Sequence, residues 1–123
     1  MEQYIDITFE GEYIKVITCG GGIDFARRLW SQVKQACNEH KCFSVLGIGN
    51  TTSLSTMEAY DHAALFRELE LSLKYRIAWV ETNADTRDII AFTETVLYNR
   101  AFPGRLFSDV CAAKEWLLDY RDA

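Results

Sequence analysis

The chain has 123 residues, of which 49% are hydrophobic and 13% aromatic, a composition typical of a single globular domain. Acidic residues outnumber basic residues 18 to 13, for a net charge of -5, which argues against nucleic acid as a partner because lysine and arginine supply affinity for phosphates. No run approaches the roughly 18 apolar residues that a membrane span needs, and the start lacks the features of a secretory signal. We therefore expect a soluble, cytoplasmic protein whose residues 1–123 form one domain.

The first segments predict a hairpin followed by a helix. Tyr4 to Phe9 alternates polar and apolar residues with the period of a half-buried strand, and Tyr13 to Thr18 gives the second strand. Gly20 to Gly22 predicts a tight strand-to-helix turn, because glycines are general turn residues. Asp24 is the predicted N-cap of a helix that ends near Asn38 to Lys41. The apolar stripe of this helix is Phe25, Ala26, Leu29, Trp30, Val33 and Cys37.

The rest of the chain alternates strands with helices. Phe43 to Ile48 is a continuous apolar run, typical of a strand buried on both faces of a parallel sheet. A hydroxyl-rich loop separates this strand from the next helix. The remaining predicted elements are a helix over Met57 to Leu73, a strand over Tyr75 to Glu81, a helix that follows the turn Thr82 to Asp85, an edge strand over Arg105 to Phe107, and a last helix capped by Ser108 that turns Tyr120 inward. This order predicts a mostly parallel sheet with one antiparallel strand.

Cysteine and histidine are too sparse and too scattered to predict a metal site. None of the cysteines has C-x-x-C spacing, and the chain has only His40 and His62 to complete a set of ligands. We expect no metal, no cofactor and four reduced thiols. The cysteines are Cys19, Cys37, Cys42 and Cys111.

The element order and four C-terminal segments resemble the SpoIIAA-like branch of the STAS superfamily. The segments are Arg76–Glu81, Asn99–Phe102, Arg105–Asp109 and Ala112–Leu117. The resemblance covers the whole chain and implies a single α/β domain with the order β-β-α-β-α-β-α-β-α. It implies a mixed, mostly parallel five-stranded sheet with helices packed mainly on one side. It also implies a regulatory or ligand-sensing module.

Anti-sigma-factor antagonists of this superfamily carry a phosphorylatable serine in an Asp-Ser-Ser-Gly-like turn before the second main helix. Residues 50–57 occupy the corresponding place here, without that motif. Ser55 and Glu58 have the spacing of a capping box, which explains Ser55 by helix structure alone. The alternative is a phosphorylated or partner-binding loop, since a helix N-terminus favours a phosphate. Its candidate residues are Asn50, Thr51, Thr52, Ser53, Ser55 and Thr56.

The helix predicted over Met57 to Leu73 has apolar residues on more than one face. A helix that is apolar on two sides covers the sheet with one and a ligand or second copy of the chain with the other. We favour a homodimer, because twofold self-association is the commonest way to bury such a surface. The candidate apolar ligand or dimer surface consists of Tyr60, Phe66, Leu69 and Leu73.

These patterns predict a non-enzymatic regulatory or binding module. It would act through protein–protein contacts or small-ligand sensing at the rim formed by the loops after the strands, where ligands gather in sheets of this kind. The alternative is a lipid or apolar-ligand carrier with a pocket between the second main helix and the sheet. An enzyme, such as an uncharacterised hydrolase, would need His62 or Cys111 beside a pocket with a polar partner. Neither residue stands in a nucleophile motif, so we expect no catalytic residue.

Overall fold

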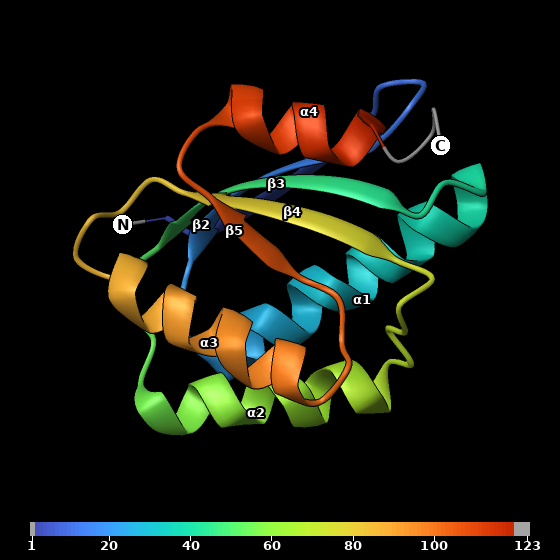
Figure 1. The fold of residues 1–123 in the computed structure, drawn as a ribbon. Helices are drawn as coiled ribbons and strands as arrows, with labels where there is room; N and C mark the ends of the chain where they lie inside the picture. Colours follow the sequence, from blue (N-terminus) through green and yellow to red (C-terminus); the bar gives the residue numbers. More distant parts are fainter. Residues whose placement is uncertain (1, 120–123) are drawn as a thin grey trace.

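Five strands form one sheet whose spatial order, β1-β2-β3-β4-β5, follows the order along the chain. The computed structural model describes residues 2–119 (Figure 1). The β1–β2 hairpin is antiparallel and all other pairings are parallel, which confirms the predicted mixed sheet. The strands are β1 (Tyr4–Phe9), β2 (Ile14–Gly20), β3 (Ser44–Thr51), β4 (Arg76–Glu81) and β5 (Arg105–Phe107).

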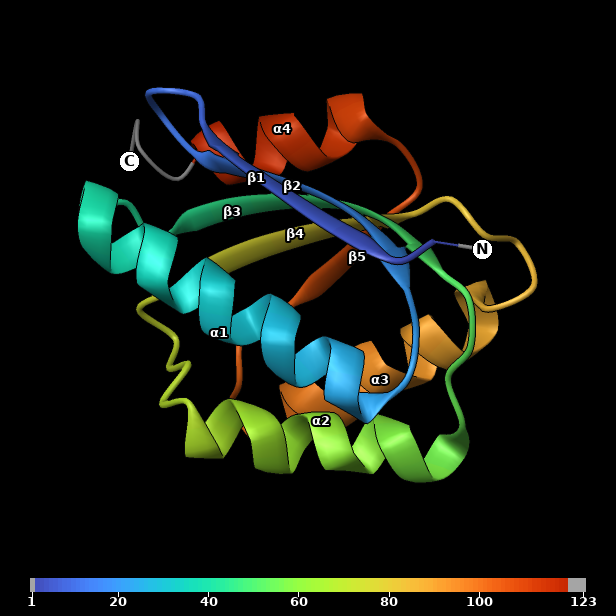
Figure 2. The same cartoon turned by 180° about the vertical axis from the view of Figure 1, so that it is seen from behind.

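Three of the four helices cover one face of the sheet, and the fourth covers the other face (Figures 1 and 2). The helices are α1 (Ile23–His40), α2 (Thr56–Glu68), α3 (Arg87–Asn99) and α4 (Val110–Asp119). Helix α2 packs on α1 and α3 and lies farther from the sheet than either of them (Figure 2). The larger hydrophobic core lies on the face of α1, α2 and α3, and a smaller core lies beneath α4. The predicted fold class is therefore confirmed.

The second main helix is shorter than predicted, because it ends at Glu68 and not at Leu73. Glu70 adopts a left-handed conformation with φ 59°, and the Leu71 N–H then donates to the Phe66 carbonyl at 2.9 Å. This is a Schellman motif, in which an apolar residue folds back on the last turn of the helix. Leu71 is fully buried as a result. The apolar residues predicted to continue the helix instead form its C-terminal cap and the following turn.

Two predicted helix caps are also wrong. Helix α1 begins at Ile23 after the N-cap Gly22, whose φ of 87° is easy only for glycine, so Asp24 lies in the first turn. Before α4, the carboxylate of Asp109 accepts a hydrogen bond from the Ala112 N–H at 2.8 Å, so the cap is not Ser108. Tyr120, predicted to point inward, lies outside the described residues.

Two glycines in the central strand β3 make room for a tryptophan on the neighbouring strand. Gly47 pairs with Trp79 across β3 and β4, and a Cβ atom at Gly47 or at Gly49 would overlap the indole ring. The ring therefore lies flat across β3, on the face covered by α1. Its centroid is 5.8 Å from that of Trp30 in α1. The two glycines are a packing requirement of the core.

Candidate functional site

The loops after β2 and β3 lie against each other through their backbones at the carboxyl edge of the sheet. The Thr52 N–H donates to the Gly20 carbonyl at 3.1 Å, and the Gly22 N–H donates to the Ser53 carbonyl at 3.2 Å. A Cβ atom at Gly21 would lie 2.5 Å from the Ser53 backbone, so only glycine allows this approach. Gly20 to Gly22 thus form the predicted tight turn, which is shaped around the loop after β3.

The predicted capping box at the start of α2 is present and also holds the start of α1. The Ser55 hydroxyl accepts from the Glu58 N–H at 3.1 Å, and the Glu58 carboxylate accepts from the Ser55 N–H at 2.9 Å. The same carboxylate accepts from the Ile23 N–H at 3.2 Å. Hydrogen bonding by the Ser55 N–H lowers the pKa of Glu58, with smaller contributions from the Ser55 hydroxyl and Ile23. A carboxylate therefore already occupies the position where a phosphate could bind these helix N-termini.

A buried carboxylate that the sequence patterns did not single out joins the loops after β3 and β4. Glu81 is only 1% exposed, at the end of β4. Its oxygens accept from the Thr51 N–H at 2.7 Å, the Thr51 hydroxyl at 2.6 Å, the Trp79 indole N–H at 3.1 Å and the Asn83 N–H at 3.2 Å. The Thr51 carbonyl in turn accepts from the Asn83 amide at 2.9 Å and the Thr86 hydroxyl at 2.8 Å. Glu81 therefore connects the end of β3 to the loop after β4 at this edge of the sheet.

The six candidate loop residues fall into two groups. Thr52, Ser53, Ser55 and Thr56 are exposed. Asn50 and Thr51 are half-buried and belong to β3, which extends beyond the predicted end at Ile48. The Thr51 hydroxyl donates to the Glu81 carboxylate, whereas the side chains of the four exposed residues lie at the surface of the loop.

A cavity of about 100 Å³ lies beneath this edge, between the sheet and helices α1, α2 and α3. At one end its walls are the two contacting loops, through Gly20 to Gly22, Thr51, Ser53 and Leu54. The interior walls are mainly apolar, and they include Phe25, Leu29, Trp30, Phe66, Trp79 and Leu97. Their few polar groups come from Thr18, His62, Thr93, Glu94 and Arg105. An apolar chamber with a few polar groups is the usual form of a small-ligand site.

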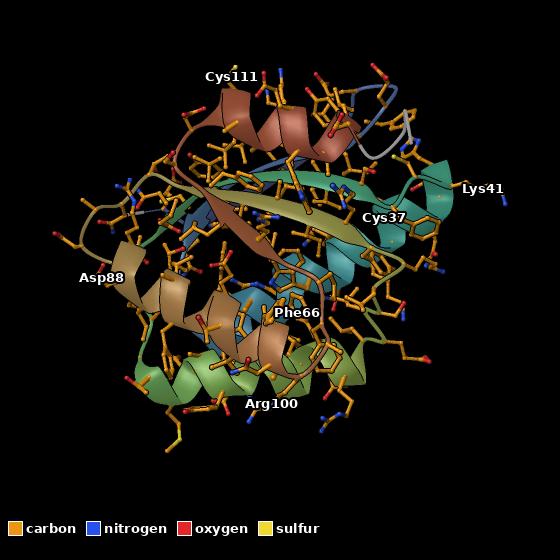
Figure 3. All side chains as sticks on the ribbon, viewed as in Figure 1. Cys37, Lys41, Phe66, Asp88, Arg100 and Cys111 are labelled. Carbon is orange, nitrogen blue, oxygen red and sulfur yellow. The ribbon has the colours of Figure 1, made fainter. Side chains whose placement is uncertain are left out.

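The four residues of the predicted apolar surface do not form one surface. Phe66 is 1% exposed and points from α2 into the interior, where it lines the cavity (Figure 3). Tyr60 is 47% exposed, and its ring packs edge-on against Phe92 at 5.5 Å. Leu69 is half-buried at the end of α2, and Leu73 is 67% exposed beyond it. Phe66 therefore faces the cavity, whereas Tyr60 and Leu73 face solvent. A ligand surface and a dimer surface would be formed by different residues of this set.

The two residues considered for catalysis lie on opposite faces of the sheet. His62 lines the cavity, and its Nδ1 is 2.7 Å from the Glu58 carbonyl. Cys111 is exposed on α4, on the far side (Figure 3). Among residues 2–119, no group of three or more histidine, cysteine, aspartate or glutamate residues could hold a metal ion. None of the described helices combines the length and apolar character needed to cross a membrane.

The lowered pKa of His62 predicts how stability depends on pH. Burial lowers the pKa of His62, against smaller opposing effects of the Glu58 carbonyl and of the Glu58 and Asp61 charges. Below its ordinary pKa of about 6.5, the unfolded chain binds a proton more readily than the folded one. The free energy of unfolding should therefore fall as pH drops through about 6.5. Urea titrations at pH 7.5 and 5.5 measure this change. His62→Gln should flatten the dependence, and a variant as pH-dependent as the wild type would contradict the role of His62.

The cysteines should differ sharply in reactivity. Burial raises the pKa of Cys37 to about 12, and Cys111 is exposed. Because the thiolate is the reactive form, iodoacetamide at neutral pH should modify Cys111 first and leave Cys37 unmodified in the folded protein. Peptide mapping after timed alkylation measures the order, with Cys111→Ser removing the first adduct. Early labelling of Cys37 would contradict this burial.

Comparison with known proteins identifies the fold that this sheet and its helices form. Neither the models of known protein families nor the sequences of curated proteins match the chain. The structure is similar to the crystal structure of an uncharacterized protein of the DUF3478 family with a SpoIIAA-like fold, from Shewanella loihica PV-4. The TM-score is 0.54 at 16% identity, over 94% of this chain and 93% of that chain. The chain thus has a SpoIIAA-like fold, as the resemblance implied, and at this identity the likeness concerns the fold alone.

Proposed function

We propose that this chain is a non-catalytic module that senses a small apolar ligand held in the cavity beneath the sheet. The observation that carries the proposal is the position of this cavity, which runs from the loops after β2 and β3 to Phe66 in α2. This arrangement combines two expectations from the sequence. The ligand would lie between the second main helix and the sheet, and its binding would change the arrangement of the loops at the rim.

The size and lining of the cavity suggest the class of ligand. A dry apolar cavity of about 150 Å³ accommodates benzene or xenon. The cavity of about 100 Å³ therefore suits a group no larger than one ring or a short aliphatic segment. Trp30, Phe66 and Trp79 would contact it from three elements, and each apolar contact removed from water favours binding. A longer ligand would extend toward the rim.

Occupancy of the cavity would be communicated through the rim loops. Ser53 and Leu54 line the cavity, and the neighbouring Thr52 is exposed to a partner. The backbone bonds between the two loops would make them shift together. A ligand can favour one loop arrangement only by binding it more tightly than another. We therefore infer that the exposed hydroxyl-rich loop is the surface on which a partner protein would detect the ligand.

Native mass spectrometry of the purified protein tests this proposal. We expect a retained small apolar molecule, and we expect Ala26→Leu to abolish its retention because the larger side chain would fill the cavity that Ala26 lines. Ala64→Leu is the matched control, since Ala64 is exposed on α2. Retention by Ala26→Leu at the wild-type level would place the ligand elsewhere and contradict the proposal.

The outer face of α2 supports a second proposal, a homodimer. Met57 is 72% exposed and Tyr60 is 47% exposed, one turn apart on this helix. Two large apolar side chains on one exposed face favour self-association. Light scattering over a concentration series should show a dimer that Met57→Glu weakens. A wild-type protein that stays monomeric throughout would rule the dimer out.

A further inference from the structure

A second and larger concavity lies at the opposite edge of the sheet, where the parallel strands β3 and β4 begin. It is a groove of about 850 Å³. Its walls come from the β1–β2 turn, the end of α1, helices α3 and α4, the turns after α2 and α3, and the starts of β3, β4 and β5. Lys41, which lines it, lies just beyond the end of α1 (Figure 3). Concavities of several hundred Å³ are typical of small-molecule sites.

Aromatic side chains form much of the groove. Phe43 and Tyr75 lie side by side in an edge-to-face contact, with ring centroids 5.2 Å apart. Tyr98 is 78% exposed at the groove, so its ring is available to a ligand. The aromatic residues that line the groove are Phe9, Phe43, Tyr75, Tyr98, Phe102 and Trp116. Such rings offer flat contact area to another aromatic group.

The groove is also locally cationic in a chain of net charge -5. Four basic side chains line it, Lys41, Lys74, Arg76 and Arg105, against the two carboxylates Glu12 and Glu94. The Glu94 carboxylate already accepts a hydrogen bond from the Leu106 N–H at 2.6 Å. Basic side chains therefore outnumber acidic ones here, which is the reverse of the whole chain.

Three of these cations, Lys74, Arg76 and Arg105, lie against rings. The Lys74 ammonium is 4.3 Å from the Phe43 ring centroid, and the Arg105 guanidinium is 5.7 Å from that of Trp116. Within residues 2–119, neither has a carboxylate within salt-bridge distance, 4.0 Å. Cation–π contacts position these charges without neutralising them. They therefore remain able to attract an anion.

We propose that this groove binds a small organic anion with an aromatic body. The anionic group would pair with Lys74, while Arg105 adds to the positive charge of the groove, and the ring would stack against the half-buried Phe43 and the exposed Tyr98. A charge-assisted hydrogen bond and aromatic packing would act together on one ligand. The ligand class differs from the uncharged group proposed for the internal cavity, and the proposal does not depend on that function. The two sites share a wall made of Ile77, Glu94, Gly104 and Arg105.

Naphthalene-2-sulfonate and its uncharged analogue naphthalene-2-sulfonamide test this proposal. Backbone amide shifts measured by NMR during titration give both the affinity and the location. We expect the sulfonate to shift the amides of Phe43, Lys74 and Phe102, and we expect the sulfonamide to bind at least about tenfold more weakly because it lacks the charge. Equal affinity for the two compounds, or no groove shifts at millimolar sulfonate, would overturn the proposal.

Lys74→Gln tests whether the charge of Lys74 binds the anionic group of the ligand. Lys74 is exposed, so its replacement should leave the fold intact, which the same NMR spectra verify. We expect the affinity for the sulfonate to fall about tenfold, as expected for one lost charged contact. Lys114→Gln is the matched control, because the Lys114 ammonium also lies over a ring, 5.7 Å from that of Tyr13, yet outside the groove. Unchanged affinity in Lys74→Gln, or an equal loss in Lys114→Gln, would contradict the assignment.

Discussion

Gly49→Ala should lower the free energy of unfolding by about 3 kcal/mol, the upper part of the usual range for overpacking a core. The new methyl group would overlap the indole ring of Trp79, which lies across Gly49 and Gly47. The ring has little freedom to move, because its N–H donates to Glu81 at 3.1 Å and it packs near Trp30. Urea denaturation followed by circular dichroism measures the change.

The double variant Gly49→Ala/Trp79→Leu distinguishes steric overlap with the Trp79 ring from a general effect of alanine on strand β3. Trp79→Leu alone should destabilise the protein, because it removes the ring and its hydrogen bond. In that background the added cost of Gly49→Ala should be much smaller, since its steric partner is gone. The same cost in both backgrounds would contradict the account of Gly49.

Glu81→Gln is the second substitution with a large expected effect, a loss of about 3 kcal/mol in the free energy of unfolding. The carboxylate accepts four hydrogen bonds in a buried site. An amide has only one oxygen, so its NH2 group would face donors and leave at least one of them unpaired. Glu39→Gln, at an exposed position of α1, should change stability by less than about 0.5 kcal/mol.

Hydrogen exchange shows whether Glu81 also orders the rim. In Glu81→Gln we expect faster exchange of the Thr51 and Asn83 amides, which donate to the carboxylate in the wild-type protein. Amides in the β1–β2 hairpin should be less affected, because they pair with backbone groups. Unchanged protection at Thr51 and Asn83 would mean that the loops hold their shape without Glu81.

The strand and helix order was predictable because it rests on local patterns. Alternation in Tyr4 to Phe9 and the apolar run beginning at Phe43 determine the strands, and the Ser55–Glu58 capping box depends on residues only three apart. The end of α2 was not predictable in the same way. Helices commonly stop at glycine or proline, whereas here Glu70 takes the left-handed position and costs roughly 1 kcal/mol.

The candidate site was only partly predictable because its key contacts join distant residues. The loop after β3 was identified from its hydroxyl groups, but Glu81 meets Thr51 across 30 positions of sequence. The spacing of Trp79 and Glu81, two apart on one strand, was a weak signal that both side chains share a face. The cavity depends on how α1, α2 and α3 are placed beneath the sheet, and no local pattern encodes that placement.

Toluene titrated into the isotopically labelled protein tests the central claim most directly. We expect backbone amide shifts to concentrate at Gly21, Ser53 and Phe66, which line the cavity from the rim to the interior. In Ala26→Leu these shifts should disappear, whereas Ala64→Leu should behave like the wild type. Shifts confined to the surface around Met57, or identical shifts in Ala26→Leu and the wild type, would contradict ligand binding beneath the sheet.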